Sequence, residues 1–445
     1  MKGQKRRGLL YAMALLCLLL LVGCSDIYEV TGEEPEGQGK TARELPEDTP
    51  WNHGYHAIME TEAGYYTNQS TMCLRYYDKA SGQSILLCNK PECEHKGGDT
   101  CEATYRGIKT INSLMYKGSI YVLGMDENQS EVSINLYKAA LDGSAIDKVG
   151  CVISAENAKK EEITIRQTEM IDMGFHDKPD YSFIIHKGYA YIPYLLRFGK
   201  GSMGLKGGGL VKMDLKTGET QELYSIKYLA EGVPGRLSGV GDYVYFRVYG
   251  NYSGSSVKRY VISTDQVEDV YGTNPGMPDD KINLNAYVFG ADRIYGFQTR
   301  REGEKEFLEV VTMDAATGEF LPEERIQTEM EYSPYTLRAA FLYDNKLFLA
   351  DDTHGCWYDR QGAKVAEIAF PEELAGTRLQ VNPWERNDYS MEYKVNDGKL
   401  YLMFSDASDD FYATEYMYRR MKVFSCDLKE LFEGRGEWKE AFVTE

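Results

Sequence analysis

The sequence predicts an all-β fold because one hairpin pattern recurs along it. The clearest copy is residues 393–404, where two apolar runs flank Asn396-Asp397-Gly398. An Asp-Gly pair between such runs favours a tight hairpin, because both central turn residues must tolerate positive φ. The run from Leu400 to Phe404 is apolar throughout, which indicates a strand covered on both faces. The 35 tyrosines, and the 43 glycines against 13 prolines, also favour strands and turns.

An aromatic residue three positions after the turn marks seven copies of this hairpin. Successive copies are roughly 50–56 residues apart, with one longer interval between the second and third copies. The aromatic residues are Tyr65, Tyr121, Tyr191, Tyr245, Tyr295, Phe348 and Tyr401. A repeat of this length indicates an array of equivalent supersecondary units.

A second turn, usually headed by Asp, follows each aromatic strand. The copies are Asp78–Gly82, Asp142-Gly143, Asp214–Gly218, Asp314–Gly318 and Asp359–Gly362, with degenerate versions at Thr264-Asp265 and Asp427-Leu428. Each unit therefore holds two hairpins, and four-stranded units of this length predict a β-propeller of seven blades. A six-bladed ring that leaves out Tyr65, or a ring with an eighth degenerate blade, stays open as an alternative.

Residues 1–23 are predicted to be a lipoprotein signal peptide. A basic start precedes an apolar run at 9–22, which is too short to be a comfortable membrane span. The run ends in Leu21-Val22-Gly23-Cys24, which resembles the lipobox of bacterial lipoproteins, where cleavage before the cysteine leaves that cysteine lipidated. The resemblance implies a lipid anchor at Cys24 and a location on the extracytoplasmic face of the cell membrane. An ordinary secretory signal is the alternative.

Residues 24–50 are predicted to be the lipidated cysteine and an acidic disordered tether, and residues 51–445 the propeller domain. The net charge of −19 argues against nucleic acid as a partner. The longer interval predicts an insertion in the 155–209 region. Its Gly199–Gly204 stretch matches G-x-G-x-x-G, but a glycine-rich strand follows instead of a helix, which excludes a dinucleotide site.

One segment, residues 87–103, contains a cluster of metal-ligand residue types. Its spacing is C-x4-C-x-H-x5-C, and the candidate ligands are Cys88, Cys93, His95 and Cys101. Three thiolates and one imidazole suit a structural zinc ion. A disulfide, Cys88–Cys93 or Cys93–Cys101, remains one alternative in an extracytoplasmic chain, and free thiols are the other. The scattered cysteines are predicted to be small core residues; they are Cys73, Cys151, Cys356 and Cys426.

At this segment the chain resembles the uncharacterised surface lipoproteins of clostridia-like bacteria. These proteins combine a lipobox, an acidic tether and a propeller-like repeat domain of unknown function. The matching positions are Leu87, Cys88, Asn89, Pro91, Cys93, His95, Cys101 and Ala103. The resemblance implies a location and a fold, and it implies no reaction.

The loops that leave the aromatic strands should all emerge on one face of a propeller, where they would surround the central channel. The charged candidates there are Asp126, Glu127, Arg300, Arg301, Asp351, Asp352, Asp406, Asp409 and Asp410. Clustered carboxylates could bind Ca²⁺ or a cationic group, although solvated loop charge is the plainer interpretation. His186 and His354 are interpreted as turn or packing residues, and the sequence contains no G-x-S-x-G, H-E-x-x-H or P-loop motif.

These observations predict a lipid-anchored binding or scaffold module for an envelope protein or glycan, and they leave open whether it catalyses a reaction. A glycosidase or lyase that uses carboxylates in the channel is one alternative, although that chemistry requires a defined carboxyl separation. A structural subunit of an envelope complex is another.

Overall fold

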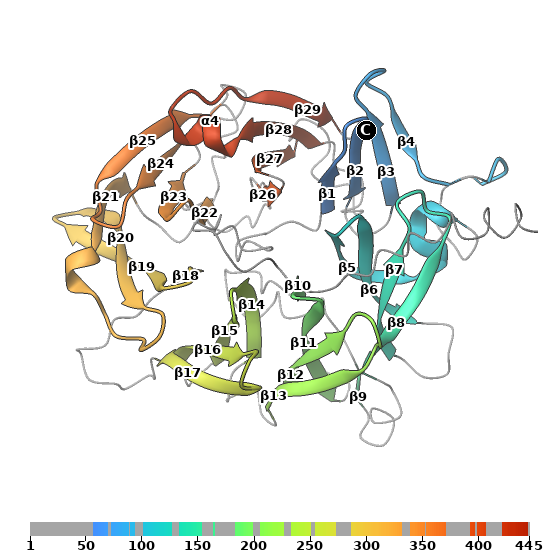
Figure 1. Cartoon of the computed structure of the whole chain (residues 1–445), viewed down its shortest axis with the longest axis horizontal. Helices are drawn as coiled ribbons and strands as arrows, with labels where there is room; N and C mark the ends of the chain where they lie inside the picture. The colour runs from blue at the N-terminus through green and yellow to red at the C-terminus, as the bar shows by residue number, and fades with distance from the viewer. Residues whose placement is uncertain are drawn as a thin grey trace, which may run out of the picture. The chain divides into compact units, whose positions relative to one another are not determined.

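The computed structural model is a β-propeller of seven blades (Figure 1). All of the residues that it describes lie in the unit Arg43–Glu445. They are 57–69, 73–88, 90–93, 101–126, 133–153, 163–164, 183–198, 205–226, 233–250, 254–272, 286–331, 339–351, 353–370, 392–396, 398–405 and 421–443. No helix among them is both long and apolar enough to cross a membrane.

The first four blades follow one another along the chain. Blade 1 is β1 (Ala57–Glu60), β2 (Gly64–Gln69), β3 (Cys73–Asp78) and β4 (Ser84–Leu86). After the short helix η1 (Glu102–Gly107), blade 2 is β5 (Lys109–Tyr116), β6 (Ser119–Asp126), β7 (Ser133–Ala139) and β8 (Ile146–Ile153). Blade 3 is β10 (Ile184–His186), β11 (Tyr189–Phe198), β12 (Leu205–Asp214) and β13 (Thr220–Ile226). Blade 4 is β14 (Val233–Val240), β15 (Tyr243–Gly250), β16 (Gly254–Val261) and β17 (Gln266–Gly272).

The remaining three blades repeat the plan. Blade 5 is β18 (Ala286–Phe289), β19 (Arg293–Glu302), β20 (Lys305–Asp314) and β21 (Ile326–Glu331), with η4 (Pro322–Glu324) before its last strand. Blade 6 is β22 (Ala339–Tyr343), β23 (Lys346–Ala350), β24 (His354–Tyr358) and β25 (Lys364–Ala369). Blade 7 is β26 (Glu392–Asn396), β27 (Lys399–Ser405), β28 (Met421–Asp427) and β29 (Lys439–Val443), with α4 (Leu428–Phe432) between the last two.

Each blade is an antiparallel sheet whose strands pair in chain order. The first strand of each blade lies nearest the centre and the fourth lies at the rim (Figure 1). The seven aromatic residues of the repeat all fall on the second strand of a blade, and each is buried. The described part of the chain thus confirms seven blades, including the one built around Tyr65.

The Asp-headed turns join the third and fourth strands. Asp78, Asp214 and Asp314 each accept a hydrogen bond from the backbone N–H of the Ser or Thr three residues later, at 2.7–3.0 Å. The glycine that ends each of these turns has φ between 68° and 74°, which a side chain would disfavour. In the degenerate blade 7 copy, Asp427 caps α4 instead, accepting from the N–H groups of Lys429 and Glu430.

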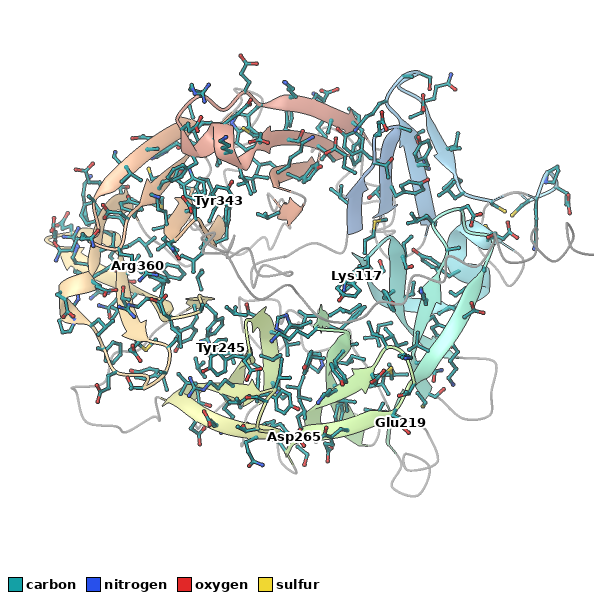
Figure 2. The ribbon with its side chains drawn as sticks, in the orientation of Figure 1. Lys117, Glu219, Tyr245, Asp265, Tyr343 and Arg360 are labelled. Atoms are coloured by element: carbon teal, nitrogen blue, oxygen red, sulfur yellow. The ribbon has the colours of Figure 1, made fainter. Side chains whose placement is uncertain are left out.

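The core lies between blades as well as within them. Tyr245 of blade 4 stacks on Phe289 of blade 5 with ring centroids 4.6 Å apart, and Figure 2 shows it within the packed side chains. Trp357 of blade 6 meets Phe432 of blade 7 edge-on at 5.6 Å. Burial on both faces explains why the inner strands are apolar at successive positions.

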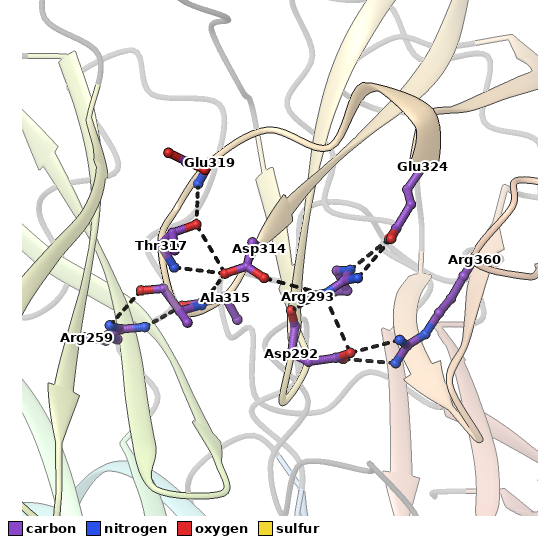
Figure 3. Close-up of polar contacts among 10 residues, drawn as sticks. Arg259, Asp292, Arg293, Asp314, Ala315, Thr317, Glu319, Glu324 and Arg360 are labelled. Carbon is purple, nitrogen blue, oxygen red and sulfur yellow. Dashed lines mark hydrogen bonds and ion pairs between the residues drawn. The ribbon is translucent and has the colours of Figure 1, made fainter.

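Arginines of neighbouring blades hold the turns of blade 5 (Figure 3). From blade 4, Arg259 donates to the carbonyl oxygens of Ala315 and Ala316. From blade 6, Arg360 makes a bidentate ion pair with Asp292 at 2.8 and 2.9 Å. Bidentate geometry fixes orientation as well as distance, and these contacts link blade 5 to both of its neighbours.

Blades 7 and 1 share no strand in the described part of the chain, where side-chain contacts join them. The Glu60 carboxylate accepts hydrogen bonds from Lys399 and Tyr401 of blade 7, both at 2.7 Å, and from Lys79 of its own blade at 2.6 Å. Beneath these contacts, Phe442 stacks on Tyr77 with centroids 4.4 Å apart. This combination of an apolar layer and a nearly buried ion cluster closes the ring.

The predicted insertion adds a strand to blade 3. Within the described residues of the 155–209 region, β9 (Ile163–Thr164) pairs with the end of β11. The glycines Gly207, Gly208 and Gly209 belong to β12 itself, which agrees with a strand at that point.

We predict that Glu60→Gln weakens the fold by about 1–3 kcal/mol, because it leaves two lysines of the closing contact without their anion. Burial favours the neutral acid, but hydrogen bonds from Lys399, Lys79 and Tyr401 outweigh it and hold the pKa of Glu60 at about 2, against 4.5 ordinarily. Because the folded-state pKa is depressed, this stabilisation is complete above about pH 4.5 and is lost as the pH falls towards 2.

Urea unfolding of the wild type and of Glu60→Gln between pH 3 and pH 7 measures this effect. The difference in unfolding free energy should shrink on acidification. The exposed Glu62→Gln on the adjoining turn is the control and should behave as the wild type. A difference that stays constant across this pH range would contradict the role assigned to the carboxylate.

Candidate functional site

Three of the four predicted metal ligands come together beside blade 1. Cys88 follows β4, Cys93 lies in the next turn and Cys101 immediately precedes η1. Their Sγ atoms all lie within 4.8 Å of one another, and the cysteines are thiols in this structure. The fourth predicted ligand, His95, falls outside the described residues.

Local backbone contacts hold the three cysteines in place. The Leu87 N–H donates to the Leu74 carbonyl oxygen at 3.0 Å, which fixes the chain as it leaves β4. The Cys93 N–H donates to the Lys90 carbonyl oxygen at 3.1 Å and closes a turn around Pro91. Beyond Cys101, the buried ring of Tyr105 packs with Leu74 and Ile120 between blades 1 and 2. The cluster therefore sits where the chain passes from one blade to the next.

The environment of Cys88 favours its thiolate. Burial alone would raise its pKa, but hydrogen bonds to the sulfur outweigh that effect and lower the pKa. The donors are the backbone N–H of Lys90, the backbone N–H of Glu102, the Cys93 side chain and the backbone N–H of Ala103. Because a cysteine binds metals as the thiolate, the amide groups that converge on this sulfur suit a metal ligand.

The geometry of the three sulfurs fits a tetrahedral ion after small side-chain movements. Zinc–sulfur bonds of about 2.3 Å place neighbouring sulfurs roughly 3.7 Å apart. Three thiolates also match the preference of Zn²⁺ for soft ligands over the oxygen ligands that Ca²⁺ and Mg²⁺ take.

The predicted ligand-face residues lie at one end of the blades where they are described. Asp126 ends β6, Arg300 and Arg301 lie near the end of β19, and Asp351 follows β23. All four belong to the ends of second strands, and antiparallel order puts these ends on the same face of the ring. The residues of this prediction outside the described part are Glu127, Asp352, Asp406, Asp409 and Asp410, and Cys24 of the predicted anchor lies there too.

Two of these charged residues already have structural roles. Arg300 donates to the Thr328 carbonyl oxygen at 3.1 Å and pairs with Glu302. Asp351 accepts from the N–H groups of Thr353 and His354 at 2.7 and 2.9 Å, which shapes the turn into β24. In contrast, Arg301 has 79% of its side chain exposed and forms an ion pair with Glu306.

The scattered cysteines lie in strands, as predicted for core residues. Cys356 and Cys426 are buried, and burial raises the pKa of the Cys356 thiol to about 11 and of the Cys426 thiol to about 12. Cys151 is half-buried in β8, and Cys73 begins β3.

A second group of ligand types was missed by the sequence reasoning. One nitrogen of His354, the Cys356 sulfur and one oxygen of Glu367 lie within 4.8 Å of one another. The alternating His-Gly-Cys spacing puts two of them on one face of a strand. The third depends on the pairing of β24 with β25, which the sequence does not show.

No family model and no curated sequence matches this chain. Solved structures that resemble it include the β-propeller domain of the trilobed protease from Pyrococcus furiosus, with 10% identity, a TM-score of 0.41 and coverage of 75% of this chain and 82% of that one. An oligogalacturonate lyase in complex with manganese has 10% identity, a TM-score of 0.47 and coverage of 80% and 84%. A puromycin hydrolase has 10% identity, a TM-score of 0.47 and coverage of 89% and 55%. The chain thus spans about half the length of the hydrolase.

Proposed function

We propose that this protein is a non-catalytic binding propeller, held outside the cell membrane by a lipid, that recognises an envelope protein or glycan with one face of its ring. The observation that carries the proposal is the difference between the two faces. On one face lie the tight turns, such as Lys117-Gly118 and Asp344-Asn345. The strand ends of the other face are joined by connections of varied length, from Gly303-Glu304 between β19 and β20 to residues 406–420 between β27 and β28.

This difference supports recognition because a rigid scaffold that carries variable loops is a common way to build a binding site. The tight turns are occupied by contacts between blades, as for Arg360 with Asp292 (Figure 3). This second face includes the exposed Arg301, and in the sequence the acidic residues at 406–410 belong to the connection between β27 and β28. Mixed charge of this kind suits a polar partner.

We predict that replacing Asp406, Asp409 and Asp410 together by Asn weakens binding to the envelope partner at least tenfold, because the charges belong to the proposed recognition face. The measurement is pull-down and titration of the full chain against purified cell-wall polysaccharide and solubilised envelope proteins. The control is Asp344→Asn on the tight-turn face, which should bind as the wild type.

Loss of binding in the control would contradict the assignment of the face. Release of new sugar ends by the wild type, abolished by Asp352→Asn or Asp406→Asn, would overturn the non-catalytic proposal in favour of a glycosidase or lyase. If a partner co-purifies in fixed stoichiometry with the wild type and with every variant of the recognition face, the structural-subunit alternative would be favoured.

We also propose that Cys88, Cys93, Cys101 and His95 hold a structural zinc ion. The three sulfurs within 4.8 Å of one another support this proposal. The ion would tie the chain after β4 to the start of η1 and thereby secure the seam between blades 1 and 2. A site closed by four protein ligands stabilises a fold and leaves no position for substrate.

We predict that Cys88→Ser lowers the zinc content of the full chain by one ion and lowers its melting temperature by several degrees, because metal binding contributes to folding. Metal analysis with a thiol count measures the first effect, and calorimetry the second. Cys151→Ser, at an equally half-buried thiol, is the control. If Cys88→Ser leaves the zinc content unchanged, and the thiol count of the wild type shows two of the three cysteines oxidised, the disulfide would be established instead.

The lipid anchor rests on the lipobox-like sequence that ends at Cys24. Two acyl chains on one cysteine give stable membrane attachment, which a single chain does not. We predict that Cys24→Ala moves the protein from the membrane fraction to the soluble exported fraction, measured by cell fractionation and immunoblotting. Membrane attachment that survives this change would contradict lipidation at Cys24.

A further inference from the structure

The second group of ligand residues lies on one face of blade 6. His354 and Cys356 are two positions apart on β24, so their side chains project from the same side of the sheet. On the neighbouring strand β25, Glu367 pairs directly with Cys356. Directly opposed residues of an antiparallel pair have their Cβ atoms about 4.5–5.5 Å apart. Regular strand geometry therefore positions all three side chains without help from a flexible loop.

Polar contacts at Nδ1 orient the imidazole of His354. Its Nδ1 lies 2.8 Å from Thr353 Oγ1 and 3.2 Å from Asp351 Oδ1. An Nδ1–H that donates to these oxygens leaves a lone pair on Nε2, and that nitrogen faces Glu367 Oε1 at 3.8 Å. Histidine ligands of metal ions are commonly held in this way by a carboxylate on the far nitrogen.

The Glu367 carboxylate divides its two oxygens between different neighbours. Lys364 donates to Oε2 at 2.8 Å, while Oε1 is the oxygen that faces His354. The lysine thus fixes the rotation of the carboxylate and leaves Oε1 directed at the group. The Cys356 sulfur is almost fully buried, at 4% exposure, whereas the Glu367 side chain is 47% exposed. The cluster thus opens from the core towards solvent on one side.

We propose that His354, Cys356 and Glu367 form a mononuclear transition-metal site that is suited to Zn²⁺. The donors are one imidazole nitrogen, one cysteine sulfur that loses its proton when the metal binds, and one carboxylate oxygen, a set that zinc accepts and that Ca²⁺ and Mg²⁺ do not favour. Tetrahedral zinc places such donor atoms roughly 3.3–3.7 Å apart. The present separations, all within 4.8 Å, need only side-chain rotation to reach these values.

Three protein ligands leave the fourth position of a tetrahedral ion for water or for a bound ligand. The site lies at the end of β24 that follows Asp351, so it belongs to the face on which the second strands end. A metal there would present an acceptor for an anionic or carbonyl oxygen at the edge of the proposed recognition face. The site differs from the cysteine cluster of blade 1 in both its location and this open position.

The experiment is a zinc titration of the full chain in competition with a chromophoric chelator. Glu367→Gln keeps every thiol, so the blade 1 cluster is left intact, and its side chain is too exposed for the change to threaten folding. We expect Glu367→Gln to weaken one class of zinc site about tenfold or more. Cys356→Ala should remove that same class and leave the other zinc bound.

The matched control is Glu440→Gln, which alters an exposed glutamate on the fourth strand of blade 7, opposite Phe424 instead of a thiol. It should titrate as the wild type. If Glu367→Gln binds zinc with the stoichiometry and affinity of the wild type, the proposed site is wrong, whether or not Cys356→Ala folds. Equal weakening by Glu440→Gln would also overturn it, since the effect would then be one of surface charge.

Discussion

The ring is closed, within the residues that the structure describes, by side-chain contacts between blades 7 and 1. The four main strands of every blade are consecutive in the chain, and among the described residues no strand of blade 7 pairs with the sheet of blade 1. Glu60 is surrounded instead by Lys399, Tyr401 and Lys79, above an apolar layer that includes Phe442. The chain itself links every other pair of neighbouring blades, so only this seam has to close the ring. Because the Glu60 carboxylate is largely buried and accepts three hydrogen bonds, protonation or removal of this one group would weaken the closure. A seam made only of apolar side chains would not have this sensitivity.

The sequence determined the architecture unusually well because each blade repeats the same local physics. Turn residues such as Asn396 and Gly398, followed by the apolar run through Tyr401, specify a hairpin without reference to distant contacts. Even Tyr65, whose turn is the weakest match, proved to lie on the second strand of its blade. Blade number followed from counting these local units. The pairing of blades around the ring, in contrast, depends on contacts such as Arg360 with Asp292, whose partners are far apart in sequence.

The candidate sites were predictable in proportion to how local they are. Cys88, Cys93 and Cys101 lie in one short segment, and turns alone bring their sulfurs together. The approach of Glu367 to Cys356 requires the exact alignment of β24 with β25, and the bulge between Trp357 and Tyr358 shifts that register. A bulge leaves little trace in sequence. Asp351 was predicted to be a ligand-face carboxylate because the sequence does not show its hydrogen bonds. In the structure it shapes the turn that positions His354.

Each blade is built from one continuous stretch of chain. Duplication or loss of one such stretch adds or removes a whole blade and leaves every other sheet intact. The contacts between blades, such as Tyr245 with Phe289, then have to differ from seam to seam if the blades are to keep their order around the ring. A circular permutation that opens the chain at a blade boundary would likewise cut no sheet, and it would change which blade comes first without changing which blades are neighbours.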